Sequence, residues 1–198
     1  MSVLYGLVVC GGESTRMGTD KSALEYYGQP QRNYLYHMLQ PMCSKVFLSC
    51  NSEQLPYIPY YYSPMPDAVK YERIGPMGAL LTAFDLHPEA SFLVIGCDYP
   101  FLKSSDVQHL LHYRKSTGLA TAYYNPYNSL YEPLLAIYES GLKDKLFSNY
   151  EQGKHSLQHL LKEVDAEEIY PLTTDVIRSI DNKEAYEQAL LEIRSAGF

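Results

Sequence analysis

The feature that most constrains the fold is one string near the start of the chain, VVCGGESTRMGTDK at 8–21. It continues an apolar run rich in β-forming residues, which predicts a buried first strand. The run breaks at Gly11 and Gly12, where the backbone is free to adopt positive φ and to approach a ligand closely. The N–H groups of such a turn can bind an anion, and Arg16 and Lys21 supply positive charge beside it. The string therefore predicts a strand that leads into a phosphate-binding turn.

The spacing of this string excludes two common nucleotide-binding loops. A Walker A loop needs G-x-x-x-x-G-K-[ST], and the dinucleotide-binding loop of dehydrogenases needs G-x-G-x-x-G. Here Gly18 is followed by Thr-Asp-Lys, and neither pattern is present in the string. A P-loop enzyme is therefore excluded, and a dehydrogenase is disfavoured.

Two further predicted strands end in polar residues. The apolar segment within 91–102 ends at Gly-Cys-Asp, which places Asp98 at a strand tip. A carboxylate there is costly unless it has a partner or a ligand, and Mg²⁺ prefers one or two carboxylates together with phosphate oxygens and water. The segment 45–51 ends at Asn51, where ligands bind in an open parallel sheet, although a turn-forming Asn explains this residue as well.

Strands and helical segments alternate along the chain, which predicts one domain over 1–198 with a mainly parallel sheet between two helical layers, a Rossmann-like three-layer α/β/α sandwich. Helices are expected over 30–42, from 76 onward, over 104–116, 140–150 and 153–163, and at the C-terminus. Further strands are expected over 118–124 and 131–138, with short ones at YIPYYY (57–62), at 167–172 and in VIRSI from 176.

Composition limits the cellular setting and the partners. A net charge of −7 argues against a broad nucleic-acid-binding surface, and no segment is long and apolar enough to predict a membrane span or a signal peptide. Cys10, Cys43, Cys50 and Cys97 form no C-x-x-C pair and are interpreted as reduced thiols. We expect a cytoplasmic protein, a monomer or weak oligomer, with neither nucleic acid nor membrane as partner.

Taken whole, GG-x-S-x-RMG-x-DK resembles the signature loop of nucleotidyltransferases that activate sugars and cofactors with nucleoside triphosphates. Its MG-x-DK ending is most similar to the molybdenum cofactor guanylyltransferases, the molybdopterin-guanine dinucleotide biosynthesis protein A family. Cys10 stands where that family usually has Ala, and this small residue is compatible with the loop. The resemblance covers nearly the whole chain and is strongest at 8–21, 75–80 and 96–102.

The resemblance implies a set of site residues. The GP-x-x-G/A string (GPMGA at 75–79) and the acid upstream of it resemble the family's base-and-ribose region, although Asp67 is also explained as a solvated loop acid. CDYPFL resembles the metal-binding CD-x-P motif, which implies Asp98 as a Mg²⁺ ligand. The implied catalytic residues are Lys21, Arg16 and Asp98. The implied nucleotide-binding residues are Val9, Cys10, Gly11, Gly12, Lys21, Asn51, Asp67, Gly75, Gly78 and Asp98.

Candidates for the acceptor side also come from the resemblance. Glu132 lies in an E-P-L string similar to that of the strand entering the acceptor site, and Lys154 and His155 match a basic loop near the pterin. For these two residues a surface helix cap is an equally good interpretation. Asp181 replaces part of the family's N-x-N-T string. It is a second candidate Mg²⁺ ligand or, with Glu184, a D-x-x-E capping box at a helix start.

The activity that the resemblance implies is Mg²⁺-dependent transfer of GMP from GTP to molybdenum-molybdopterin, with release of pyrophosphate. The expected partners are GTP, molybdenum-molybdopterin and a protein that delivers molybdopterin. The nucleophile arrives with the acceptor, so no Ser–His–Asp set is needed. Two alternatives stay open: a cytidylyltransferase acting on molybdopterin or on a sugar or polyol phosphate, and a non-catalytic nucleotide-binding regulator on the same fold.

Overall fold

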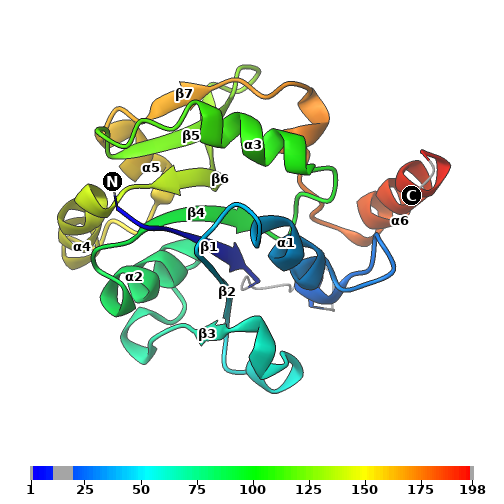
Figure 1. Cartoon of the computed structure of the whole chain (residues 1–198), viewed down its shortest axis with the longest axis horizontal. Helices are drawn as coiled ribbons and strands as arrows, with labels where there is room; N and C mark the ends of the chain where they lie inside the picture. Colours follow the sequence, from blue (N-terminus) through cyan, green and yellow to red (C-terminus); the bar gives the residue numbers. More distant parts are fainter. Residues whose placement is uncertain (1, 11–19, 197–198) are drawn as a thin grey trace.

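A computed structural model of the chain describes residues 2–10 and 20–196, and its elements form a layered α/β structure (Figure 1). Its strands are β1 (Leu4–Val9), β2 (Lys45–Cys50), β3 (Pro64–Pro66), β4 (Ser91–Gly96), β5 (Ala120–Asn125), β6 (Leu130–Tyr138) and β7 (Glu167–Ile169). Its α-helices are α1 (Gln31–Leu39), α2 (Pro76–Leu86), α3 (Ser104–His112), α4 (Lys143–Glu151), α5 (Leu157–Glu163) and α6 (Lys183–Ser195). Short 3₁₀ turns are η1 (Lys21–Ala23), η2 (Leu55–Tyr57), η3 (Tyr60–Tyr62), η4 (Val69–Tyr71), η5 (Ser140–Leu142) and η6 (Thr174–Ile177).

The strands form one mixed sheet in the order β3-β2-β1-β4-β6-β5-β7. β1 is parallel to β2 and β4, β2 to β3, and β5 to β7. β6 runs antiparallel to β4 and β5, because β5 and β6 are joined by a short hairpin connection that reverses the chain. The mainly parallel sheet is confirmed, with β6 as its reversed strand.

Apolar side chains cover both faces of the sheet, which confirms the three-layer sandwich. Phe84 of α2, Leu146 of α4 and Leu160 of α5 are fully buried in the core of one face. Leu35 of α1 and Leu110 of α3 are buried in the core of the other. α1, α3 and α5 bury apolar residues three or four positions apart, so each presents one apolar face to the sheet, whereas α2 is buried at every position from Met77 to Phe84.

α6 stands beside the sandwich rather than over a face of the sheet (Figure 1). It packs through Ala189 and Ile193 against Tyr26, which precedes α1, in a small separate cluster with Ile180. The C-terminal part of the chain is thereby attached to the segment that follows the first strand.

Two short strands expected from the sequence are absent from the described residues. YIPYYY forms η2 and η3, and the edge strand is β3, where prolines are tolerated because the strand has one partner. In VIRSI, the N–H of Val176 donates to Thr173 O and that of Arg178 to Asp175 O. These local bonds satisfy the backbone of η6 without a neighbouring strand.

No helix in the described part of the chain combines the length and the apolar character needed to cross a lipid bilayer.

Candidate active site

The candidate site lies where the parallel strands β2, β1 and β4 end at the same edge of the sheet. The N–H of Cys10 donates to Ser49 O at 3.0 Å, and that of Cys97 donates to Val9 O at 3.3 Å. Val9 and Cys10 are buried, at 3% and 6% exposure. This ladder brings the ends of the three strands side by side, at the edge where open parallel sheets bind ligands.

Asp98 follows β4 and has a carboxylate oxygen in an unusual environment. Its Oδ1 is buried and accepts a hydrogen bond from none of the described residues. Burial raises the pKa of Asp98 to about 6, the carboxylates of Asp181 and Glu132 also raise it, and the Lys21 ammonium lowers it. Gly96 leaves room for this carboxylate, since a Cβ there would lie 2.5 Å from Oδ1. The structure therefore holds a desolvated acid that has an unused acceptor.

Lys21 and Asp181 meet beside this acid although they are far apart in the sequence. Lys21 Nζ lies 2.8 Å from Asp181 Oδ1. The N–H of Ile180 donates to the backbone oxygen of Asp98 at 2.8 Å, which fixes the segment before α6 against the end of β4. The Lys21 side chain is 23% exposed, so an anion from solvent can reach it.

The capping-box interpretation of Asp181 and Glu184 is wrong. α6 begins one residue later than that pattern requires, and its N-cap is Asn182, whose Oδ1 accepts the N–H of Ala185 at 2.9 Å. Asn182 has the extended backbone that an N-cap needs, so the amide satisfies the helix start. The carboxylate of Asp181 is thereby directed to Lys21.

The acids present are compatible with a magnesium ion that is held mainly by a substrate. Among residues 2–10 and 20–196, no cluster of three or more His, Cys, Asp or Glu side chains is arranged to hold a metal ion. Mg²⁺ keeps several water ligands and is usually bound through one or two carboxylates plus substrate phosphates. The unpartnered Oδ1 of Asp98 fits one such ligand position, and Asp181 lies close enough to raise the pKa of Asp98.

Asp67 and Asn51 lie at the neighbouring end of β2. Ser49 Oγ donates to Asp67 Oδ1 at 3.0 Å, and the Asp67 N–H donates to Cys50 O at 3.0 Å. Burial raises the pKa of Asp67 to about 6, against the opposing effect of the Ser49 hydrogen bond. Asp67 is thus a half-buried acid fixed to β2, and its interpretation as a solvated loop acid is wrong. Asn51 Oδ1 accepts the Gln54 N–H at 2.8 Å, which agrees with the alternative interpretation of Asn51 as a turn-forming residue.

The two glycines at the start of α2 are required by the backbone. Gly75 has φ = 67°, the left-handed region that side chains disfavour, and it is the N-cap of α2. A Cβ at Gly78 would lie 2.3 Å from Tyr71 O, so only glycine lets η4 approach this helix. Gly75 thereby begins α2, and Gly78 lets the backbone at Tyr71 pack directly against this helix.

The acceptor candidates fall into two places. Glu132 on β6 accepts the Tyr99 hydroxyl at 2.9 Å and belongs with Asp98, whose pKa it raises. Lys154 Nζ lies 3.3 Å from Glu163 Oε1, and the His155 ring stacks on the Tyr150 ring. No contact among the described residues joins these last two candidates to Lys21 or Asp98. Gly11, Gly12 and Arg16 lie outside the described residues.

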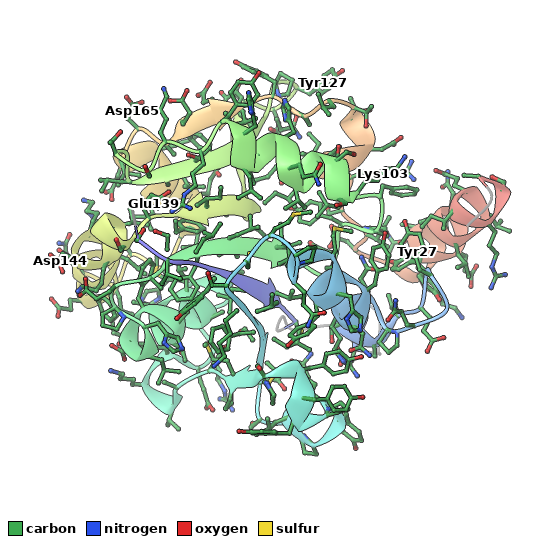
Figure 2. All side chains as sticks on the ribbon, in the orientation of Figure 1. Tyr27, Lys103, Tyr127, Glu139, Asp144 and Asp165 are labelled. Atoms are coloured by element: carbon green, nitrogen blue, oxygen red, sulfur yellow. The ribbon has the colours of Figure 1, made fainter. Side chains whose placement is uncertain are left out.

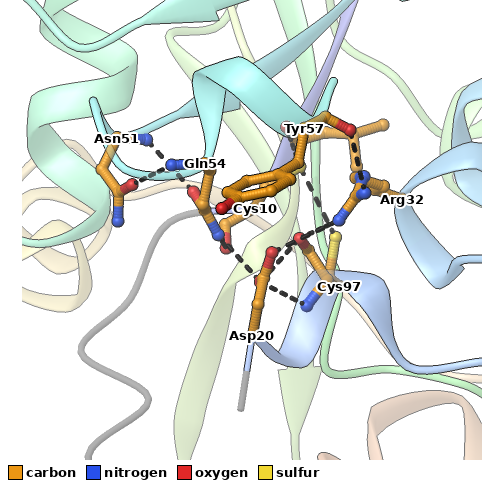
Figure 3. A network of polar contacts seen from close by, with 9 residues as sticks. Cys10, Asp20, Arg32, Asn51, Gln54, Tyr57 and Cys97 are labelled. Atoms are coloured by element: carbon orange, nitrogen blue, oxygen red, sulfur yellow. Dashed lines mark hydrogen bonds and ion pairs between the residues drawn. The ribbon is translucent and has the colours of Figure 1, made fainter. Parts of the chain in front are cut away.

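A polar network that the sequence did not indicate lies next to this edge (Figure 3). Gln54, in the turn after β2, donates from Nε2 to Cys10 O at 3.0 Å and to Asp20 Oδ1 at 2.8 Å. Arg32 on α1 donates to Asp20 Oδ2 at 3.3 Å. Nothing local marks Arg32 or Gln54, because a polar residue in a helix or turn usually faces solvent. Only Asp20, in the D-K pair, lay within a recognised string.

A comparison with known protein families identifies the family of this chain. Residues 6–169 match the family described as MobA-like NTP transferase domain. This chain belongs to that family. It is therefore a nucleotidyltransferase.

Similar proteins support this membership in the MobA-like family. The chain is 35% identical over 187 residues to the molybdenum cofactor biosynthesis bifunctional protein of Synechocystis sp., covering 93% of this chain and 53% of that protein. The chain therefore spans about half the length of that relative. It is 26% identical to the molybdenum cofactor guanylyltransferase of Pseudomonas aeruginosa, with 82% of each chain covered.

The fold is also found among solved structures. Molybdopterin-guanine dinucleotide biosynthesis protein A from Archaeoglobus fulgidus superposes with a TM-score of 0.78, covering 97% of this chain and 99% of that one at 21% identity. This likeness confirms the expected α/β sandwich.

Proposed function

We propose that the chain transfers GMP from GTP to molybdenum-bound molybdopterin, releases pyrophosphate, and uses Mg²⁺. The observation that carries the proposal is the desolvated carboxylate of Asp98 beside the Lys21 ammonium at the ends of the parallel strands, with an Oδ1 that has no hydrogen-bond partner in the described part of the chain. The guanine base and the pterin acceptor are supported by the guanylyltransferase named among the relatives. A protein that delivers molybdopterin is a further proposed partner.

The reaction needs positioning and charge neutralisation more than a protein nucleophile. A terminal phosphate oxygen of the pterin forms a bond to the α-phosphorus of GTP. The bond from that phosphorus to the bridging oxygen of the β-phosphate breaks, and pyrophosphate leaves with its electron pair. Mg²⁺ bound at Asp98 would neutralise phosphate charge and polarise the α-phosphorus.

The chain's own residues supply the rest of the proposed site. The ammonium of Lys21 binds the charge that builds on the leaving pyrophosphate, and for this it exchanges part of its contact with Asp181. Asp67 and Asn51 lie at the end of β2, where they are proposed to bind the ribose and base. Glu132, fixed by Tyr99 close to Asp98, is the acceptor-side candidate that this geometry supports, whereas Lys154 and His155 have no such support.

The test is a calorimetric titration of the purified protein with GTP, CTP, ATP and UTP in the presence of Mg²⁺. We expect GTP to bind most tightly and Asp98→Ala to abolish that preference, while Glu184→Ala, which removes an exposed acid of α6, leaves binding unchanged. In turnover assays with molybdopterin, Lys21→Ala and Asp98→Ala are expected to lower kcat about a hundredfold or more.

The other outcomes of this titration are equally informative. A preference for CTP would reassign the protein as a cytidylyltransferase. GTP binding without turnover would favour the regulator. Near-normal turnover in either alanine variant would remove Lys21 or Asp98 from the proposed mechanism.

A further inference from the structure

The side chain of Gln54 connects three segments of the candidate site (Figure 3). Its Nε2 donates to Cys10 O at the end of β1 and to Asp20 Oδ1 before η1. Its Oε1 accepts the N–H of Asn51 at 3.1 Å, after β2. Gln54 is 8% exposed, so these bonds form largely away from water. One carboxamide therefore uses both of its ends to join β1, β2 and η1.

Asp20 is the second centre of this network. Its Oδ1 also accepts the N–H and the hydroxyl of Ser22, at 3.0 and 2.8 Å. Its Oδ2 accepts from Arg32 Nη1, and Arg32, 7% exposed, also donates to Tyr57 O at 3.4 Å. Both carboxylate oxygens are thus occupied by hydrogen-bond donors. A network whose central carboxylate has donors on both oxygens holds its members in fixed positions, and loss of one donor loosens the others.

The network lies between the two halves of the proposed nucleotide site. On one side is Lys21, the residue after Asp20, whose ammonium pairs with Asp181. On the other is Asn51, at the end of β2 near Asp67. Asp20 itself is an acid close to where phosphates would bind, and it would repel them if its charge were not compensated. The guanidinium of Arg32 compensates the charge of this acid and the carboxamide of Gln54 orients it, so that the adjacent ammonium is the charge offered to a ligand.

We propose that Gln54 is a positioning residue, which holds the phosphate-binding side of the site, Lys21, in a fixed place relative to the base-binding side at Asn51. This inference rests on the proposed nucleotidyl transfer. Gln54 does not contact the reacting atoms. It acts through Asp20 and Cys10. Because it holds the site in order before phosphate binds, binding loses less conformational entropy.

The test uses three ligands in the presence of Mg²⁺: GTP, inorganic pyrophosphate and guanosine. Gln54→Glu is nearly isosteric, keeps an acceptor for the Asn51 N–H, and places a second carboxylate 2.8 Å from that of Asp20. We expect the affinity for pyrophosphate and for GTP to fall about tenfold or more, while that for guanosine changes by less than about twofold. Gln108→Glu, the same change at an exposed position of α3, is expected to alter none of the three.

A double variant separates positioning from general damage. Gln54→Glu combined with Asp20→Asn exchanges the carboxylate and the amide, which removes the repulsion and restores one donor–acceptor pair. We expect it to bind pyrophosphate at least about threefold more tightly than Gln54→Glu alone. If Gln54→Glu does not fold, Gln54→Met, which is of similar length and lacks both the donor and the charge, takes its place in the ligand comparison.

The outcomes distinguish this inference from the proposed function. If the unmodified protein binds pyrophosphate but shows no preference for GTP, guanylyl transfer fails, and the pyrophosphate comparison still tests Gln54. If the unmodified protein binds no pyrophosphate, the positioning role is overturned. Equal losses for guanosine and pyrophosphate would reduce Gln54 to a structural residue. Unchanged affinities in both Gln54→Glu and Gln54→Met would overturn the positioning role directly.

Discussion

The acids that lie beside the two ends of β4 have opposite hydrogen-bonding environments. At its start, Ser91 donates to Glu139, which lies after β6 and is 2% exposed (labelled in Figure 2). Both oxygens of Glu139 are bonded, since Arg114 donates to them from Nε at 2.7 Å and from Nη2 at 2.8 Å. At the other end of the same strand, Oδ1 of Asp98 has no partner among the described residues.

The difference separates a structural acid from a candidate ligand-binding one. A buried carboxylate with a bidentate arginine has its charge and its lone pairs satisfied by the protein. A buried carboxylate with an unused oxygen lowers the stability of the fold and is retained where a ligand completes it. We therefore expect changes at the start of β4 to affect stability, and changes at its end to affect activity.

The largest effect is expected from Glu139→Gln. This change leaves the half-buried guanidinium of Arg114 without its anion, so the free energy of unfolding should fall by about 3 kcal/mol, the lower end of the range for a buried pair. Urea unfolding measures this loss, and nucleotide binding by the folded fraction should stay within about twofold. The double variant Glu139→Gln with Arg114→Met should lose less free energy of unfolding than the two single variants lose in sum. A full loss of nucleotide binding at unchanged stability would mean that Glu139 is a ligand-binding acid and not a structural one.

Asp98→Asn should do the opposite. We expect turnover to fall about a hundredfold or more, because the substituted amide cannot neutralise a magnesium ion. The free energy of unfolding at pH 8 should rise by about 1–2 kcal/mol, because an ionised, desolvated group is removed. Chemical denaturation and a turnover assay on the same preparation check both effects. A clear loss of stability would show that Asp98 is a structural acid like Glu139.

Gly96→Ala sharpens the comparison by moving the Asp98 carboxylate without removing it. The added Cβ would lie 2.5 Å from Asp98 Oδ1 and 3.0 Å from Leu134 Cβ. We expect the affinity for Mg²⁺-GTP to fall about tenfold, with a stability loss of about 1–3 kcal/mol. Gly141→Ala is the control, since its Cβ would meet Leu119 at 3.4 Å, an ordinary contact. Equal effects of the two changes on binding would contradict a site at Asp98.

The smallest effect concerns Asp67 and its pH dependence. Its folded pKa of about 6 lies above the ordinary value of 3.8, so the folded protein holds the proton more tightly than the unfolded chain. Ionisation of Asp67 therefore lowers the free energy of unfolding as pH rises from about 4 to about 6. Above pH 6 this loss of stability stays constant. Asp67→Asn should be more stable than the unmodified protein by about 1–2 kcal/mol at pH 8.

This difference should shrink as pH falls from about 6 and vanish below about 4, in thermal unfolding without nucleotide or metal. Glu184→Gln, at an exposed acid of α6, is expected to show no such trend. A stability gain of Asp67→Asn that is the same at every pH would mean that burial of the charge is not its cause.

Much of the fold was predictable because each element carries its own pattern. The strands before Cys10 and Asp98 are continuous apolar runs, and α2 begins with a proline after a glycine of positive φ. The failures came where the pattern was short. VIRSI has too few residues to distinguish a strand from a 3₁₀ turn, and the start of α6 depended on one residue, Asn182 rather than Asp181.

The sequence by itself determined Lys21 and Asp98 as the candidate side chains for the proposed chemistry, because they follow a glycine turn and a strand whose local signals are strong. The tertiary structure decided what surrounds them. It brings Asp181 to Lys21 across 160 positions, and joins Gln54 to Asp20 across 34. It also places Glu132, but neither Lys154 nor His155, beside Asp98. Such pairings arise from packing between distant elements, and no local periodicity or motif encodes the distance between two atoms on separate strands.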